Sequence, residues 1–131
     1  MFLVDTSAWI EFFRKGSRLE LGSTVELDEI VTCLPVIQEV LQGFQDEHAF
    51  RIALGSMRGF PVVESPLRAE LFDEAVNLYR SARRLGLTVR SGVDCIIAAC
   101  AIRHELTVLH HDRDFDHLAK VSPLMTQDIL A

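Results

Sequence analysis

The sequence predicts an α/β protein in which a central parallel sheet of four to five short strands is covered by helices on both faces. Short apolar runs alternate with longer helix-spaced stretches along the whole chain, the order expected of a parallel sheet. The runs are almost free of polar residues, as strands buried on both faces require. With 131 residues, of which 49% are hydrophobic and 24% charged, the chain is expected to form a single domain, spanning 1–131, around one core.

The first elements repeat the pattern of a strand followed by a helix. An apolar strand is expected at 2–5, and the hydroxyl residues that follow it can cap a helix at 6–14. The polar stretch 15–29 predicts a loop, with room for a short amphipathic helix. A second strand is expected at 30–33 and a helix at 35–44 that carries a proline in its first turn.

The second half of the chain continues this alternation. The expected elements are helices at 46–57, 66–85, 91–104 and 114–120 and strands at 61–64, 107–111 and 124–126. Gly86 suits the end of the longest helix, because glycine is favoured just beyond a helix terminus. No repeat, linker or low-complexity segment interrupts the domain.

Composition restricts the class of protein and its compartment. The formal net charge of −6 argues against generic coating of nucleic acid, which needs a basic surface, but it does not exclude an enzyme that acts on nucleic acid. The apolar amino terminus has no basic region and meets Asp5 early, so neither a signal peptide nor a membrane association is expected. Cys33, Cys95 and Cys100 lack metal-site spacing and predict buried free thiols in the reducing cytoplasm.

Three acids stand alone in apolar surroundings. Asp5, Glu39 and Asp94 are each the only charged residue of their stretch. An ionised carboxylate in such a place costs several kcal/mol unless it is paired, hydrogen-bonded or coordinated. The sequence offers no matching set of isolated basic residues, so each of these acids requires some other partner.

The predicted topology brings the acids to one edge of the sheet. Asp5 ends the first strand, Asp112 and Asp114 follow a later one, and Glu39 and Asp94 are expected early in helices that start from the same edge. Ligands of open α/β sheets bind at this edge. Oxygen-only ligands suit Mg²⁺ or Mn²⁺, so the pattern predicts a divalent-metal site for phosphate chemistry.

A structural role remains open for some of the acids. Any one of them could be a helix cap, a surface group or an ion-pair partner. This alternative is strongest for Asp114 and Asp116, because acids favour the first turn of a helix.

The motifs resemble those of PIN-domain ribonucleases, and more closely those of the VapC toxins of bacterial type II toxin–antitoxin pairs. The resemblance covers nearly the whole chain through four blocks, VDTSAWIEFF (4–13), TCLPVIQEVLQGF (32–44), SGVDCIIAACAI (91–102) and LHHDRDFD (109–116). It implies a PIN-like α/β/α sandwich, an Mg²⁺- or Mn²⁺-dependent endoribonuclease and frequent homodimers. It also implies hetero-oligomers with a small VapB-type antitoxin.

The resemblance assigns roles to four acids. It implies that Asp5, Glu39, Asp94 and Asp112 form the catalytic metal site, with Glu39 either a ligand or the group that accepts a proton from the attacking water. Hydrolysis by a metal-activated water would leave a 5′-phosphate and a 3′-hydroxyl.

Supporting roles fall on residues beside these acids. The resemblance implies that Thr6 or Ser7 supplies a hydroxyl and that Asp114 is the nearby acid of the D-x-D-F element. Arg113 could neutralise the pocket, touch the scissile phosphate or pair with Asp116. His111 stands where many relatives have Thr or Asn, so a polar contact at that position does not carry over.

Further residues are candidates for binding RNA or the antitoxin. Four arginines at the end of the long helix and beyond could contact RNA phosphates or form a solvated face: Arg80, Arg83, Arg84 and Arg90. Aromatic residues of the first helices could stack on bases, although their helical spacing favours core or interface: Trp9, Phe12, Phe13 and Phe44. The segments 15–29 and 46–57 are the candidates for a groove that receives an antitoxin helix.

Other functions fit less well. Consecutive His110 and His111 point to opposite faces of a strand, so at most one could serve a metal-free mechanism. A Mg²⁺-dependent phosphotransferase with an acidic pocket also needs an acid after the first strand. However, this chain has neither the D-x-D-x-T of haloacid-dehalogenase phosphatases nor the lysine of receiver domains. A non-catalytic PIN-like binding module would be favoured by lost acids, and none of the main four is missing.

Overall fold

Five short parallel strands form the centre of the computed structural model, which describes residues 1–14 and 20–130. The strands are β1 (Phe2–Val4), β2 (Ile30–Cys33), β3 (Val62–Val63), β4 (Thr107–His110) and β5 (Met125–Asp128). Their order in the sheet is β3-β2-β1-β4-β5, and every pair is parallel. The predicted parallel sheet of four to five strands is therefore confirmed.

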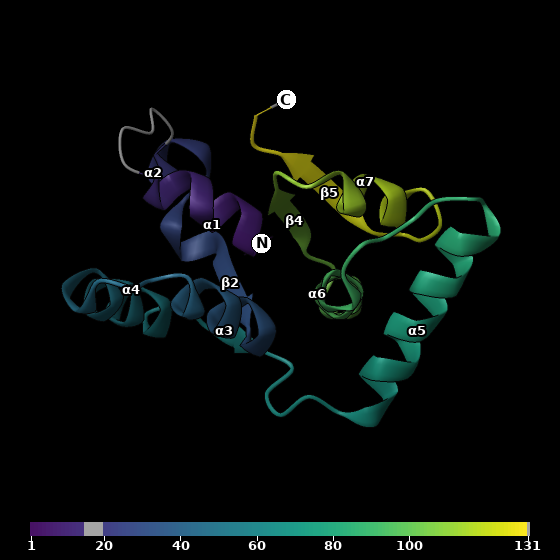
Figure 1. Ribbon diagram of the computed structural model, residues 1–131, viewed down its shortest axis with the longest axis horizontal. Helices are drawn as coiled ribbons and strands as arrows, with labels where there is room; N and C mark the ends of the chain where they lie inside the picture. The colour runs from purple at the N-terminus through teal and green to yellow at the C-terminus, as the bar shows by residue number, and fades with distance from the viewer. Residues whose placement is uncertain (15–19, 131) are drawn as a thin grey trace.

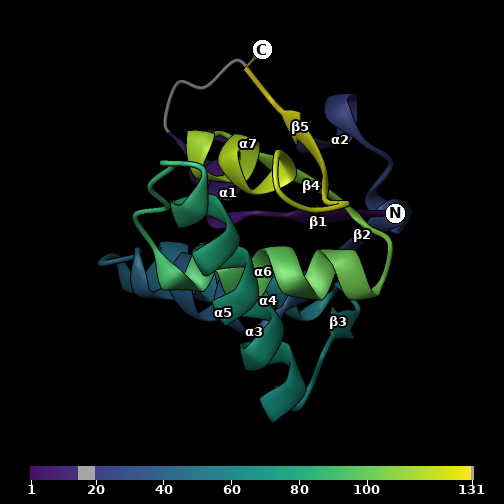
Figure 2. The same cartoon turned by 90° about the vertical axis from the view of Figure 1, so that its right-hand side faces the viewer.

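The helices form a layer on each face of the sheet. They are α1 (Thr6–Phe13), α2 (Leu21–Thr24), α3 (Leu34–Gln42), α4 (Glu47–Arg58), α5 (Ala69–Arg84), α6 (Gly92–Arg103) and α7 (Arg113–Ala119), with a 3₁₀ turn at Leu27–Glu29. In Figure 1, α1 to α4 lie in the left half of the view and α5 to α7 in the right half. Figure 2 is turned so that the layer of α5 to α7 faces the viewer. The three layers agree with the expected α/β/α sandwich.

Helix α6 carries much of the core. It is apolar around most of its circumference, and seven of its residues are buried, as expected for a helix enclosed by other elements. Ile97 and Ala98 in its middle are fully buried. All three cysteines are buried free thiols, as predicted.

Several predicted boundaries were wrong by a few residues. The longest helix begins at Ala69 rather than at residue 66, because Arg68 is extended (φ −104°, ψ 158°) and serves as its N-cap. The third strand covers two residues instead of 61–64, because Glu64 has a positive φ of 54° that a strand cannot continue through. The last strand lies at Met125–Asp128 rather than 124–126.

The polar stretch 15–29 contains more structure than a loop. Helix α2 and the 3₁₀ turn occupy its second part. The first part of the proposed antitoxin groove, 15–19, lies outside the described residues.

Among the described residues, no helix has both the length and the apolar character that a bilayer crossing needs.

Candidate active site

Asp5 is fixed where β1 ends and α1 begins. It is the N-cap of α1, and its Oδ2 accepts hydrogen bonds from the Ser7 backbone N–H (3.0 Å) and the Ser7 hydroxyl (2.6 Å). Ser7 Oγ in turn accepts a hydrogen bond from the His111 backbone N–H at 2.9 Å. The predicted supporting hydroxyl therefore joins the ends of β1 and β4, and it holds Asp5, which is only 3% exposed, at that junction.

Glu39 reaches the same edge from α3. Its Oε1 accepts a hydrogen bond from Thr6 Oγ1 at 2.9 Å, so the second predicted hydroxyl also contacts a site acid. The expectation that Glu39 lies early in its helix was wrong, because it is the sixth residue of α3. It comes to the site because α1 and α3 pack side by side.

Three further acids form a tight cluster. Asp94 in the first turn of α6, and Asp112 and Asp114 after β4, each offer an oxygen that lies within 4.8 Å of the others. Asp112 is the N-cap of α7, and its Oδ1 accepts the Asp114 backbone N–H at 3.0 Å. Asp114 lies in the first turn of α7, as the alternative interpretation expected, but it is only 1% exposed and so is not a surface group.

Burial makes this cluster hard to ionise. The pKa of Asp94 is raised to about 8, first by burial and then by the charges of Asp5, Asp112, Asp114 and Glu39, in that order. Burial also raises the pKa of Asp5, although the hydrogen bonds from Ser7 oppose the shift. In residues 1–14 and 20–130, neither Asp5 nor Asp94 forms an ion pair that would offset this cost.

The buried oxygens fit a metal ion. Asp5 Oδ1, Asp94 Oδ2 and Asp114 Oδ1 are buried and have no hydrogen-bond partner in the described part of the chain. Buried polar atoms are nearly always satisfied, so three such carboxylate oxygens at one sheet edge indicate a missing ligand. A hard divalent cation is the group that carboxylate oxygens prefer.

One arginine contacts the cluster, and sequence reasoning assigned it a different role. Arg90 Nη2 lies 3.3 Å from Asp112 Oδ1, its Nε lies 3.7 Å from Asp114 Oδ1, and its backbone N–H donates to Asp114 Oδ2 at 3.0 Å. Of the three roles open to Arg113, pairing with Asp116 and neutralising the pocket are not seen, because the residue is exposed and no ion pair of it occurs in the described ranges; contact with the scissile phosphate stays a prediction. In the sequence, the one hint that Arg90 would contact these acids is its place in the short loop that leads into α6, the helix of Asp94.

The consecutive histidines point to opposite sides, as predicted. His110 is fully buried, and its Nδ1 accepts the Asp112 backbone N–H at 3.1 Å. His111 is exposed, and its Nδ1 lies 3.1 Å from Asp128 Oδ1. Sequence reasoning missed that His110 supports the backbone of a site acid.

The aromatic residues of α1 pack mainly as core. Trp9 is buried and stacks on Phe13 with ring centroids 5.6 Å apart, and Phe13 meets Phe44 edge-on at 5.6 Å. Phe13 stays partly exposed beside Ile10, and both line a shallow hollow next to Glu39.

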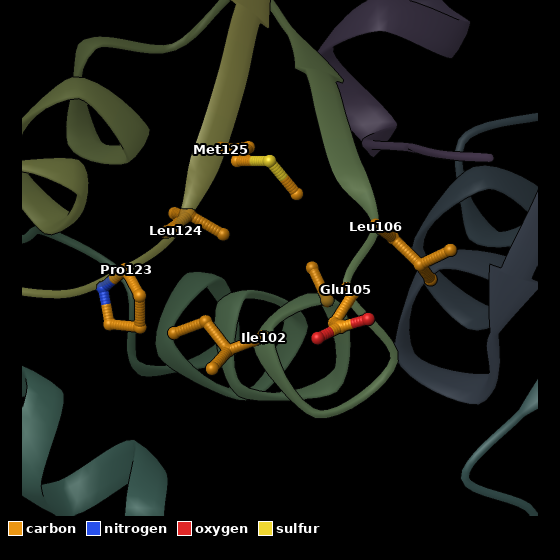
Figure 3. Close-up of a pocket in the computed structure, with 7 residues that line it drawn as sticks. Ile102, Glu105, Leu106, Pro123, Leu124 and Met125 are labelled. Carbon is orange, nitrogen blue, oxygen red and sulfur yellow. The ribbon is translucent and has the colours of Figure 1, made fainter.

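Another hollow, of about 470 Å³, opens at the opposite edge of the sheet (Figure 3), where β4 and β5 begin. Ile102, Leu106, Pro123 and Leu124 give it apolar walls, and among the described residues Glu105 is the one ionisable side chain that lines it. It therefore lacks the convergent polar groups of the acid cluster.

Comparison with known families identifies the chain. The PIN domain model matches residues 2–121. The chain is 37% identical over 129 residues to the VapC ribonuclease Mb1587 of Mycobacterium bovis. The alignment covers 95% of this chain and 96% of the relative. Ribonuclease VapC11 of Mycobacterium tuberculosis has the same identity and coverage. The chain belongs to the PIN-domain family and, within it, to the VapC ribonucleases.

Solved structures share the fold at lower identity. VapBC-1 from nontypeable Haemophilus influenzae matches with a TM-score of 0.71 and 15% identity, covering 99% of this chain and 98% of that one. FitAB bound to the IR36 DNA fragment also has a TM-score of 0.71, with 15% identity and coverage of 97% and 94%.

The raised pKa of Asp94 predicts a pH dependence of folding. Below about pH 4 the Asp94 carboxyl is neutral in both the folded and the unfolded state. Between about pH 4 and 8 it ionises only in the unfolded state. The free energy of unfolding of the metal-free protein therefore falls by up to about 1.4 kcal/mol for each pH unit in this range. Asp94→Asn should remove this loss and make the metal-free protein more stable than the parent at pH 8. Urea unfolding in EDTA between pH 5 and 8 measures the difference, and identical pH profiles for both proteins would contradict the assignment.

Proposed function

We propose that the protein is an Mg²⁺- or Mn²⁺-dependent endoribonuclease and the toxin of a type II toxin–antitoxin pair. The observation that supports it most directly is the convergence of buried, unpartnered carboxylate oxygens at the carboxyl ends of the strands in a chain of the VapC family. We take residues 1–131 as one PIN domain that acts in the cytoplasm, where its buried thiols stay reduced.

Four acids are proposed to hold the metal. Asp94 and Asp112 would ligate it together with Asp5, and Asp114 lies close enough to take part, since its Oδ1 is buried beside the other oxygens. The three clustered acids lie within 4.8 Å of one another. A ligand set made only of oxygen favours Mg²⁺ or Mn²⁺ over softer metals.

The remaining groups are proposed to prepare the attack on RNA. A bound divalent cation supplies charge stabilisation at the phosphoryl oxygens and lowers the pKa of water. Glu39 is held by Thr6 Oγ1 and is less buried than Asp5 and Asp94. It would accept the proton of the attacking water. Ser7 would keep Asp5 oriented. The products would be a 5′-phosphate and a 3′-hydroxyl.

RNA would approach an acidic molecule through local basic groups. Arg80, Arg83 and Arg84 are exposed together near the end of α5 and line a shallow hollow with Tyr79. Clustered guanidinium groups can contact RNA phosphates without selecting a base sequence.

An antitoxin is proposed to cover apolar side chains in the layer of α1 to α4. The solved neighbour VapBC-5 from Mycobacterium tuberculosis is named as a member of the VapBC family of toxin-antitoxin systems. Here Ile52 on α4 and Ile10 on α1 are each more than half exposed, and Phe50 and Leu54 flank the former. An amphipathic helix or strand of an antitoxin could bury these side chains.

The layer of α5 to α7 is proposed to form the interface of a homodimer. Phe72, Val76 and Tyr79 are exposed at helical spacing along one stripe of α5, and they border an apolar hollow against Val93 and Ile96 of α6. A second copy of the chain would bury this stripe, because a self-complementary apolar patch suits a two-fold interface.

Cleavage of total bacterial RNA tests the proposed activity. With Mg²⁺ or Mn²⁺ the purified protein should produce discrete fragments that carry 5′-phosphates, and EDTA should abolish them. Asp94→Asn should reduce the cleavage rate at least about a hundredfold, because it removes a charged ligand. Sequencing of the fragment ends measures both the target and the chemistry.

The controls separate this activity from its rivals. Asp73→Asn changes an exposed acid of α5 and should leave cleavage unaltered. Cleavage that persists in EDTA with cyclic phosphate ends would contradict a metal nuclease. A folded protein that binds Mn²⁺ but cuts no RNA would favour a non-catalytic binding module.

A charge placed at Ile52 should weaken antitoxin binding. The test measures the affinity of the purified chain for a VapB-type antitoxin by calorimetry. Ile52→Asp should lower the affinity at least about tenfold, because a buried unpaired carboxylate is costly in an interface. An unchanged affinity would place the antitoxin elsewhere.

A charge placed at Val76 should weaken the dimer in the same way. Val76→Asp should raise the dimer dissociation constant at least about tenfold in sedimentation experiments, while Ile52→Asp leaves it unchanged. The two variants are matched controls, because each adds one carboxylate to a more than half-exposed apolar position on a different face. Loss of the dimer in both variants would contradict the separate assignment of the faces.

A further inference from the structure

Arg90 binds the acid cluster through two different parts of the residue. Its backbone N–H donates to Asp114 Oδ2 at 3.0 Å. Its guanidinium approaches the other oxygen of Asp114 at 3.7 Å and Asp112 Oδ1 at 3.3 Å. The backbone contact positions Asp114 whatever side chain residue 90 carries, so the side chain contributes charge more than position.

The carboxylates that the guanidinium approaches are also those that a metal would take. Asp114 Oδ1 has no hydrogen bond, and Asp112 and Asp114 share the tight cluster with Asp94. A guanidinium and a divalent cation repel each other and compete for the same carboxylates. Holding the guanidinium and the divalent cation in contact with Asp112 and Asp114 at the same time would be energetically unfavourable.

The guanidinium can leave without unfolding anything. The Arg90 side chain is 62% exposed, whereas Asp114 is buried. Residues 85–91, between α5 and α6, contain no helix or strand, so the side chain is free to turn outward from a fixed backbone. A long, exposed arginine beside a buried acid therefore resembles a removable counter-ion.

We propose that the Arg90 side chain is a built-in counter-cation of the metal-free site, which the divalent metal displaces from Asp112 and Asp114 and which then binds a phosphate of the RNA. This rests on the proposed function, because it needs a divalent metal at the acid cluster. The chain thereby keeps buried acids partly neutralised until metal arrives, and a cationic group is then released beside the reaction site.

Metal affinity without RNA tests the displacement. Mn²⁺ titrations by calorimetry should show that Arg90→Gln binds Mn²⁺ about tenfold more tightly than the parent, since a competing charge is removed. Arg90→Lys keeps the charge and should stay within about threefold of the parent. Weaker Mn²⁺ binding by Arg90→Gln would overturn the proposal, because it would mean that the side chain preorganises the acids.

Arg113→Gln is the matched control. It removes the same charge one residue from both Asp112 and Asp114, yet Arg113 is exposed and forms no ion pair recorded for the described residues. Its Mn²⁺ affinity should change less than about threefold. An equal gain in both arginine variants would indicate a general charge effect and would overturn a specific role for Arg90.

The side chain itself can be followed by NMR. The Arg90 Nε–H signal, assigned by its loss in Arg90→Gln, should shift on addition of diamagnetic Mg²⁺ in proportion to site occupancy. A signal that stays unchanged while Mg²⁺ saturates the site would show that the guanidinium is not displaced.

RNA cleavage at saturating Mn²⁺ tests the released state. Arg90→Gln should raise KM for RNA about tenfold with a smaller change in kcat. An unchanged KM would remove the phosphate role. If the parent protein binds no Mn²⁺, the proposed function itself fails. If the parent binds Mn²⁺ and cuts RNA but Arg90→Gln binds no more tightly, only the counter-cation fails.

Discussion

The structure depends on one constraint: several carboxylates are held together in a buried place where their charges oppose one another. The parallel sheet is the cause, because Asp5 and Asp112 follow neighbouring strands whose carboxyl ends meet at one edge. Asp94 is brought against them by α6, a helix that is otherwise apolar and buried. The core therefore fixes the site, and folding of the metal-free chain must overcome the burial of Asp94 and, after it, the repulsion from the other acids, which together keep the pKa of Asp94 high.

Neighbouring polar groups fix the acids without neutralising them. Hydroxyl groups of Ser7 and Thr6 donate to Asp5 and Glu39, and the buried His110 accepts the backbone N–H of Asp112. These hydrogen bonds set direction but add no positive charge. The positive charge comes from an exposed arginine that can be removed and, by our proposal, from a divalent cation. A site that is rigid in geometry and adjustable in charge suits catalysis on a phosphodiester.

Much of this arrangement could be predicted from the sequence. Isolated acids in apolar runs carry a strong physical signal, because burying a charge is too costly to be accidental, and Asp5, Glu39 and Asp94 all appear at the expected edge. Contacts that depend on three-dimensional packing could not be predicted. Asp114 has the position of an ordinary helix-start acid, and its burial depends on how α7 packs against α5, α6 and β5. Arg90 lies in a loop without periodicity, so nothing local indicated that it would contact acids more than twenty residues away.

The central claim is that these acids form a divalent-metal site. Crystals grown with Mn²⁺ and measured at its absorption edge test this most directly, because anomalous scattering locates the ion without assumptions about activity. The account predicts a strong peak at coordination distance from carboxylate oxygens of Asp94 and Asp112, with Asp5 or Asp114 completing the ligand set. A peak elsewhere on the surface, or no peak at a concentration that supports RNA cleavage, would contradict it.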